Sequence, residues 1–75
     1  MMRGDLVHIP QGTQLFGFDS KLLDKTEKPI VGVFIEDNTI TAGWHGGTYT
    51  IYARGQETLV KKRDVYPMGD NNGVS

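Results

Sequence analysis

The apolar stretches of this chain are short and are separated by glycines and other turn-forming residues. They run for only about four to seven residues, and ten glycines are spread over 75 residues. An amphipathic helix needs an apolar period sustained over roughly ten or more residues, which these stretches do not offer. The chain therefore predicts an all-β fold of short strands joined by tight turns.

Two strands are predicted in the first half of the chain. Residues 6–9 are short and β-branched, begin after Gly4 and Asp5, and end at Pro10. Residues 30–36 follow Pro29 and are apolar on both faces, which is typical of a central strand covered on both sides.

The second half predicts a hairpin and a short last strand. Residues 48–54 alternate between apolar and polar side chains, as a half-buried strand does, and a turn at Gly55 and Gln56 leads into an antiparallel strand over 57–62. The segment 62–64 predicts a single helical turn before a last short strand that Pro67 ends.

The segments between these strands predict no extended regular structure. Residues 10–28 lack a period and predict a long ordered loop, in which a half-turn of helix at 20–24 is the one regular alternative. Residues 37–47 predict a connection with a turn at Gly46 and Gly47. The domain is expected to span 1–67, with a frayed tail over 68–75.

A core of strand residues follows from this arrangement. One barrel interior can collect the apolar positions of successive strands. The expected core residues are Val7, Val31, Val33, Ile35, Ile51, Val60 and Val65.

The stretches "GDLVHIP", "GVFIE" and "TLVKKRDVYPM" resemble the SH3-like barrel over residues 4–67. This resemblance implies a closed five-stranded barrel, with 10–28 as its long, functional first loop and a single 3₁₀ turn flanked by Val60 and Val65. The peptide-binding members have a tryptophan pair and a proline where Lys61 stands here. Polyproline binding is therefore not expected.

The stretches "RGDLVHIP" and "LVKKRDVYP" also resemble small uncharacterised proteins of tailed phages that infect marine cyanobacteria. This resemblance implies a phage accessory protein in the host cytoplasm. The start of the sequence shows no basic segment followed by a long apolar run, which agrees with a cytoplasmic location.

Chemistry-bearing residues are few. The sequence has no cysteine and two histidines, and a 75-residue domain has little volume for a catalytic pocket. We therefore expect no enzyme activity, no metal site and no cofactor.

Aromatic side chains favour a binding role. The chain has more of them than so small a core can enclose, and exposed aromatics often anchor protein contacts. Trp44 either folds back over the core or stays outside as an anchor. The residues expected to contact a protein partner are Phe16, Phe18, Trp44, His45 and Tyr52.

Two alternatives to a separate protein partner stay open. A basic edge formed by Arg54, Lys61, Lys62 and Arg63 could bind nucleic acid, although the net charge of the chain is -1. The same aromatics could instead make a homo-oligomeric structural protein. No membrane association is expected.

Overall fold

The computed structural model describes residues 2–38 and 47–68, and over these ranges the protein is all-β. Residue 1 and residues 39–46 and 69–75 lie outside the described ranges. In residues 2–38 and 47–68, no helix is long and apolar enough to cross a membrane. The elements are β1 (Leu6–Ile9), β2 (Gln14–Phe16), β3 (Leu22–Lys25), β4 (Ile30–Asn38), β5 (Thr48–Ala53), β6 (Gln56–Lys61), the 3₁₀ turn η1 (Lys62–Asp64) and β7 (Tyr66–Pro67).

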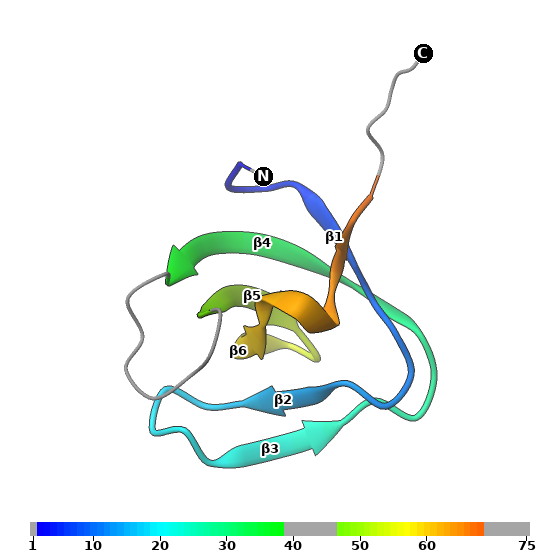
Figure 1. Cartoon of the computed structure of the whole chain (residues 1–75), viewed down its shortest axis with the longest axis vertical. Coiled ribbons are helices and arrows are strands. Elements are labelled where there is room, and N and C mark those ends of the chain that lie inside the picture. Colours follow the sequence, from blue (N-terminus) through cyan, green and yellow to red (C-terminus); the bar gives the residue numbers. More distant parts are fainter. Residues whose placement is uncertain (1, 39–46, 69–75) are drawn as a thin grey trace.

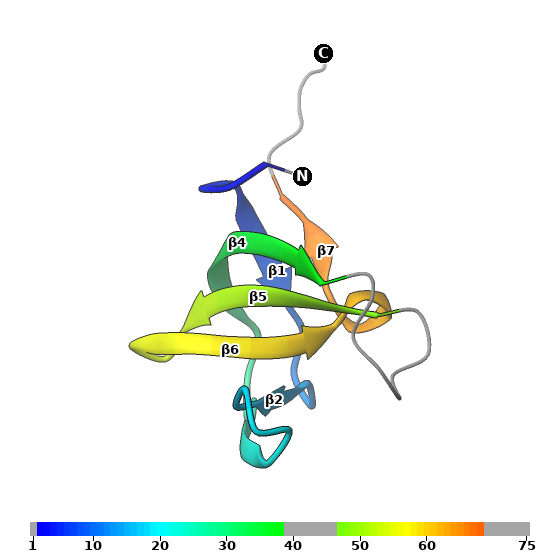
Figure 2. The same cartoon turned by 90° about the vertical axis from the view of Figure 1, so that its left-hand side faces the viewer.

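The seven strands form one antiparallel sheet in the order β3-β2-β6-β5-β4-β1-β7. The sheet curls strongly, so that β4 arches over β5 and β6 while β2 and β3 pass on their other side (Figure 1). A view from the side shows β7 next to β1 (Figure 2). A closed barrel of five strands was expected, and this expectation is wrong in two respects. The sheet has seven strands, and it is open, with β3 and β7 as its edges.

The two additional strands lie in the segment expected to be a loop. Residues 10–28 contain β2 and β3, and the alternative of a helical half-turn at 20–24 is wrong because most of this stretch belongs to β3. Pairing decides the outcome: Phe16 of β2 lies opposite Leu59 of β6 and also opposite Leu22 of β3. These tertiary contacts outweigh the weak local preference of the segment.

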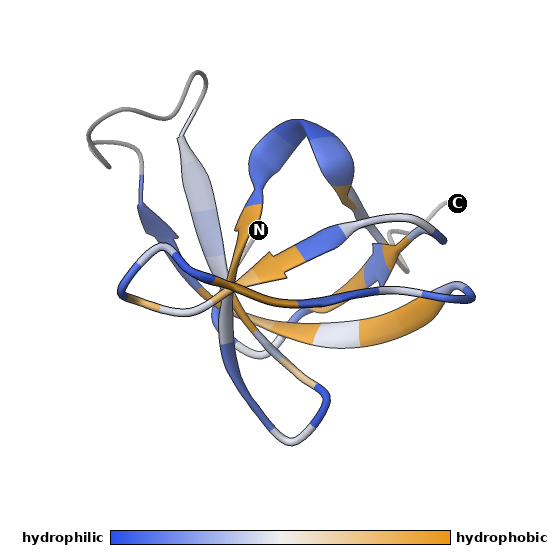
Figure 3. Ribbon diagram, turned by 90° about the horizontal axis from the view of Figure 1, so that it is seen from below, coloured by the Kyte–Doolittle hydropathy of each residue, from blue (hydrophilic) through white to orange (hydrophobic). Residues whose placement is uncertain are grey.

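The predicted β5–β6 hairpin is confirmed, with its turn one residue earlier than expected. Arg54 and Gly55 have φ angles of 57° and 81°, and a two-residue turn with positive φ at both positions matches the twist of the flanking strands. The predicted helical turn is also confirmed, since η1 lies between two buried valines, Val60 and Val65. Figure 3 shows η1 as a hydrophilic coil beside apolar strand segments.

The core confirms four of the seven expected residues, namely Val7, Ile51, Val60 and Val65. The other four members of the buried cluster are Ile9, Leu15, Phe34 and Ala53.

The expectation for β4 is wrong in its orientation. Phe34 and Gly32 face the interior, whereas Val31 is 52% exposed and Val33 and Ile35 are half-buried outside the core cluster. The cause is the register, which places Gly32 opposite Val7 and Phe34 opposite Ile51.

A buried hydrogen-bond cluster fixes the corner between β1 and β2. Thr26 Oγ1 accepts a hydrogen bond from Thr13 N at 2.9 Å and donates one to the Pro10 carbonyl oxygen at 2.6 Å, while Thr13 Oγ1 donates to the same oxygen at 2.7 Å. Both threonines are at most 5% exposed. Their hydroxyls satisfy backbone groups that the sheet leaves without a ladder partner.

Candidate functional site

A row of uncharged side chains crosses the face of the sheet that is turned away from the core. Leu6 of β1 lies opposite Val33 of β4, and Val33 lies opposite Tyr52 of β5. Met68 extends the row beyond β1, because its backbone N–H donates to the Leu6 carbonyl oxygen at 3.1 Å. Opposed residues of antiparallel strands project to the same side, so the row is continuous over the outer face.

A second row lies beside the first on the same face. His8 of β1 is opposite both Tyr66 of β7 and Val31 of β4, and the His8 and Tyr66 rings are 6.3 Å apart between centroids. The two rows together form what we call the outer patch: Leu6, His8, Val31, Val33, Tyr52, Tyr66 and Met68.

The outer patch is apolar and accessible. Leu6, Val31 and Tyr66 are each more than half exposed, and Tyr52 is 47% exposed. None of its seven residues is an Asp, Glu, Lys or Arg. Contiguous exposed apolar surface of this kind often marks an interaction site.

Only Tyr52 of the outer patch was among the residues predicted to contact a partner. Sequence reasoning did not group Leu6, Val31, Tyr66 and Met68: Val31 was expected in the core, and a single exposed apolar residue carries no signal of its own. The signal that could have found them is register, since pairing β1 with β4 and β7 lines these residues up.

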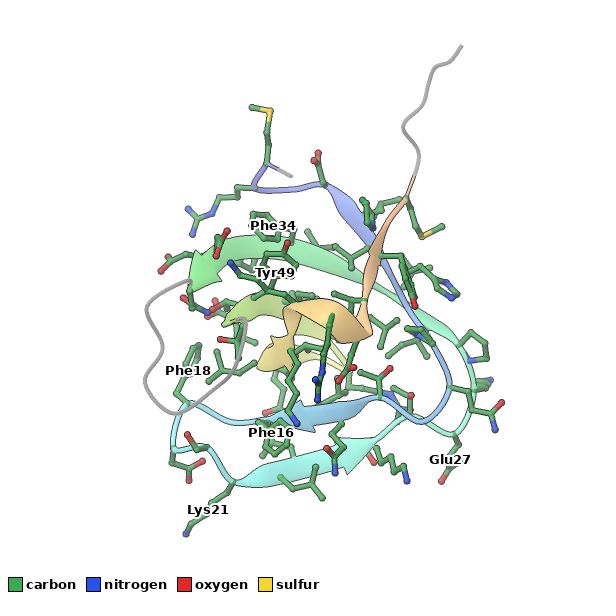
Figure 4. The ribbon with its side chains drawn as sticks, viewed as in Figure 1. Phe16, Phe18, Lys21, Glu27, Phe34 and Tyr49 are labelled. Atoms are coloured by element: carbon green, nitrogen blue, oxygen red, sulfur yellow. The ribbon has the colours of Figure 1, made fainter. Side chains whose placement is uncertain are left out.

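The two predicted phenylalanines lie elsewhere on the molecule. Phe16 is half-buried in β2, which β6 separates from the strand of Tyr52, and Phe18 is 65% exposed in the turn after β2. Figure 4 shows Phe18 at the end of the β2–β3 hairpin. Trp44 and His45 lie outside the described residues, so the expected aromatic cluster around Trp44 stays a prediction.

The predicted basic edge is divided between the two ends of the β5–β6 hairpin. Arg54 is in its turn, whereas Lys61 lies opposite Thr48 at the open end, about 17 Å away at the usual rise per residue. Lys62 and Arg63 follow Lys61 into η1. The structure therefore does not bring Arg54 together with the other three.

Carboxylates already neutralise two of these four cations. Arg54 Nη1 is 2.9 Å from Asp24 Oδ2, and Lys62 Nζ is 2.7 Å from Asp37 Oδ1. Lys62 Nζ also lies 5.4 Å from the centroid of the Tyr49 ring, a cation–π contact. These partners would compete with phosphates for both side chains.

A small polar pocket lies between the β1–β2 turn and η1. Its volume is about 230 Å³, and its lining residues are Pro10, Gln11, Gly12, Thr13, Gln14, Arg63, Asp64 and Tyr66. In the part of the chain that the structure describes, no three His, Cys, Asp or Glu residues gather in a way that could hold a metal ion.

Comparisons of the chain with protein-family models, with curated proteins and with solved structures found no match. The functional argument therefore rests on the geometry described above.

Proposed function

We propose that the protein is a non-catalytic binding module that contacts a protein partner through the outer patch. The observation that supports this most directly is the alignment of six residues from four adjacent strands, together with Met68 directly after β7, on a face turned away from the core. None of them is an Asp, Glu, Lys or Arg. Contacts with proteins are centred on apolar and aromatic side chains with few charges, which matches this composition.

At the level of fold, the proposal includes an SH3-like architecture. It is supported by the sequence resemblance over residues 4–67 and by the 3₁₀ turn between Val60 and Val65 that leads into the last strand. A role as a phage accessory protein in the host cytoplasm also belongs to the proposal and rests on sequence resemblance alone.

The charges favour a protein partner over nucleic acid. Binding to nucleic acid draws most of its affinity from cations that contact phosphates. The outer patch has no lysine or arginine, and both Arg54 and Lys62 are paired with carboxylates.

The proposal is tested by capturing partners from an extract of the source cells on immobilised protein, with and without nuclease. The patch variant carries V31S and Y66S, two exposed positions where loss of apolar surface leaves the core unchanged. The matched control is F18S, which removes a ring that lies away from the patch and is 65% exposed, compared with 56% for Tyr66. We expect the patch variant to bind the captured protein at least tenfold more weakly in calorimetry, since interface anchors contribute about 2 kcal/mol or more.

Equal binding by the patch variant and the wild type would contradict the proposal. Loss of the captured material after nuclease treatment would instead support nucleic-acid binding. In that case affinity for single strands should fall with salt at a slope of about 0.7 per neutralised charge.

A further inference from the structure

His8 lies in the middle of the outer patch. It is opposite Val31 of β4 on one side and Tyr66 of β7 on the other, and Leu6 precedes it by two residues on the same face. Figure 2 shows β1 between β4 and β7. A partner that covers the outer patch therefore also covers His8.

The His8 side chain is half-buried, and its ring lies 6.3 Å from the Tyr66 ring between centroids. Among residues 2–38 and 47–68, no group forms a hydrogen bond or an ion pair with the His8 imidazole. Its two ring nitrogens therefore depend on water for their hydrogen bonds. A partner that covers the ring removes this water.

The charged side chains around His8 lie outside the outer patch. Glu57 of β6 is opposite Tyr52, which places it three strands from β1, about 14 Å away at the usual strand spacing. Arg54 follows β5 and is paired with Asp24 at 2.9 Å. The charged residues on or within two residues of β1, β4 and β7 are Asp5, Lys28, Glu36, Asp37 and Asp64, and none of them is paired with His8.

Burial in an apolar contact affects the two charge states of an imidazole unequally. The neutral ring loses hydrogen bonds to water, whereas the imidazolium loses the hydration of a full charge, which costs far more. The outer patch has no Asp or Glu to offset that charge, and the phenol of Tyr66, which faces His8, is uncharged at neutral and acidic pH. An apolar partner therefore binds the neutral form of His8 in preference.

We propose that protonation of His8 releases an apolar partner from the outer patch, so that the contact forms at neutral pH and weakens in mildly acidic solution. This inference rests on the proposed function, and it specifies a partner whose face over His8 is apolar and carries no carboxylate. The direction follows from proton linkage: the free protein binds a proton that the complex excludes, so acid favours the free protein. Histidine is the side chain that ordinarily changes its charge between about pH 5 and pH 8.

Retention on a phenyl-substituted resin, with its uncharged phenyl groups as the apolar probe, tests this inference at about pH 8 and about pH 5.5. At the lower pH, the protonated form of an ordinary histidine exceeds the neutral form about tenfold. Other faces of the protein also contact the resin, so the retention of the wild type is expected to fall about threefold. H8Q stays neutral and should lose this fall, whereas H8K stays charged and should be retained weakly at both pH values.

The matched control is H45Q, which removes the other histidine of the sequence and should keep the fall in retention. All remaining titratable groups are common to H8Q and H45Q, so the difference between these two variants isolates His8. Circular dichroism at both pH values shows whether each variant is folded. If H8Q is not folded, the comparison of H8K with the wild type decides.

An equal fall in the wild type and H8Q, or a fall that H45Q abolishes, would overturn the inference. The variant with V31S and Y66S separates this failure from a failure of the proposed function. If that variant is retained less than the wild type at about pH 8 while H8Q keeps the fall, only the role of His8 is wrong. If it is retained as strongly as the wild type, the outer patch is not an apolar contact surface, and both proposals are overturned.

Discussion

Gly32 is the position at which a single methyl group would disturb the packing most directly. A Cβ at this position would lie 2.5 Å from Ile51 Cγ2, 3.0 Å from Ile9 Cδ1 and 3.1 Å from the Tyr52 carbonyl oxygen. Two of these atoms belong to fully buried core residues and the third is backbone, so none can move freely. The close approach of β4 to the core therefore requires glycine.

We expect G32A to lower the free energy of unfolding by about 1–3 kcal/mol through overpacking. The measurement is urea denaturation followed by circular dichroism. The control is V31A, which changes an adjacent exposed residue and should shift the free energy by no more than about 0.5 kcal/mol. A larger loss in V31A than in G32A would show that β4 turns its other face to the core.

At the scale of elements, the β1–β2 corner depends on two threonines whose hydroxyls make different numbers of hydrogen bonds. The Thr26 hydroxyl both accepts from Thr13 N and donates to the Pro10 carbonyl oxygen. The Thr13 hydroxyl only donates to that same oxygen. Removal of the Thr26 hydroxyl leaves the buried Thr13 N–H without this acceptor. Removal of the Thr13 hydroxyl leaves the Pro10 carbonyl oxygen with Thr26 Oγ1 as its donor.

We therefore expect T26V to cost about 1–3 kcal/mol, the penalty for a buried group left without a hydrogen bond, and T13V to cost clearly less. The shape of the side chain is kept in both variants, so packing contributes little to the difference. Thermal unfolding of the two variants at equal concentration measures it. Equal losses would mean that the Thr13 N–H finds another acceptor.

The elements also show what sequence reasoning could reach. The first strand was predicted at its observed bounds, Leu6–Ile9, because Gly4 lies shortly before it and Pro10 directly follows it. The short strands β2 and β3 were missed, since three and four residues with a bulge carry no readable alternation. The orientation of β4 was predicted wrongly, because a run that is apolar on both faces does not reveal which face is inward, and Gly32 was the available clue.

The candidate site was less accessible to sequence reasoning than the fold. Exposure of Tyr52 followed from counting aromatics against core size, but the outer patch joins residues 6 and 68, which only register can bring together. The placement of Arg54 beside Lys61, Lys62 and Arg63 was wrong for a related reason. Residues on the two arms of a hairpin are neighbours only when they lie at the same distance from the turn.

At the scale of the whole molecule, β7 completes both the core and the sheet. It follows Val65, which is 5% exposed within the core, and it pairs with Val7 and His8 of β1. The last strand is therefore part of the folded unit. Backbone pairing continues one residue beyond β7, since the Met68 N–H bonds to the Leu6 carbonyl oxygen.

We expect a chain shortened to end at Asp64 to lose most of its stability. Removal of the buried Val65 side chain alone costs about 2 kcal/mol, and β1 loses its edge partner as well. A chain that ends at Met68 is the control and should keep the full-length denaturation midpoint. Matching midpoints for the two shortened chains would show that β7 is dispensable.

The pairing of β1 with β7 also determines when the nascent chain can complete its sheet. Val7 pairs with Pro67, whereas the arms of the β5–β6 hairpin are joined by a two-residue turn that can close in about 1–10 μs. A ribosome adds about 5–20 residues each second, so β1 is synthesised about 3–12 s before its β7 partner exists. For that interval one side of β1 has no strand to pair with, and the pairing of β1 with β7 waits until residue 67 has been synthesised.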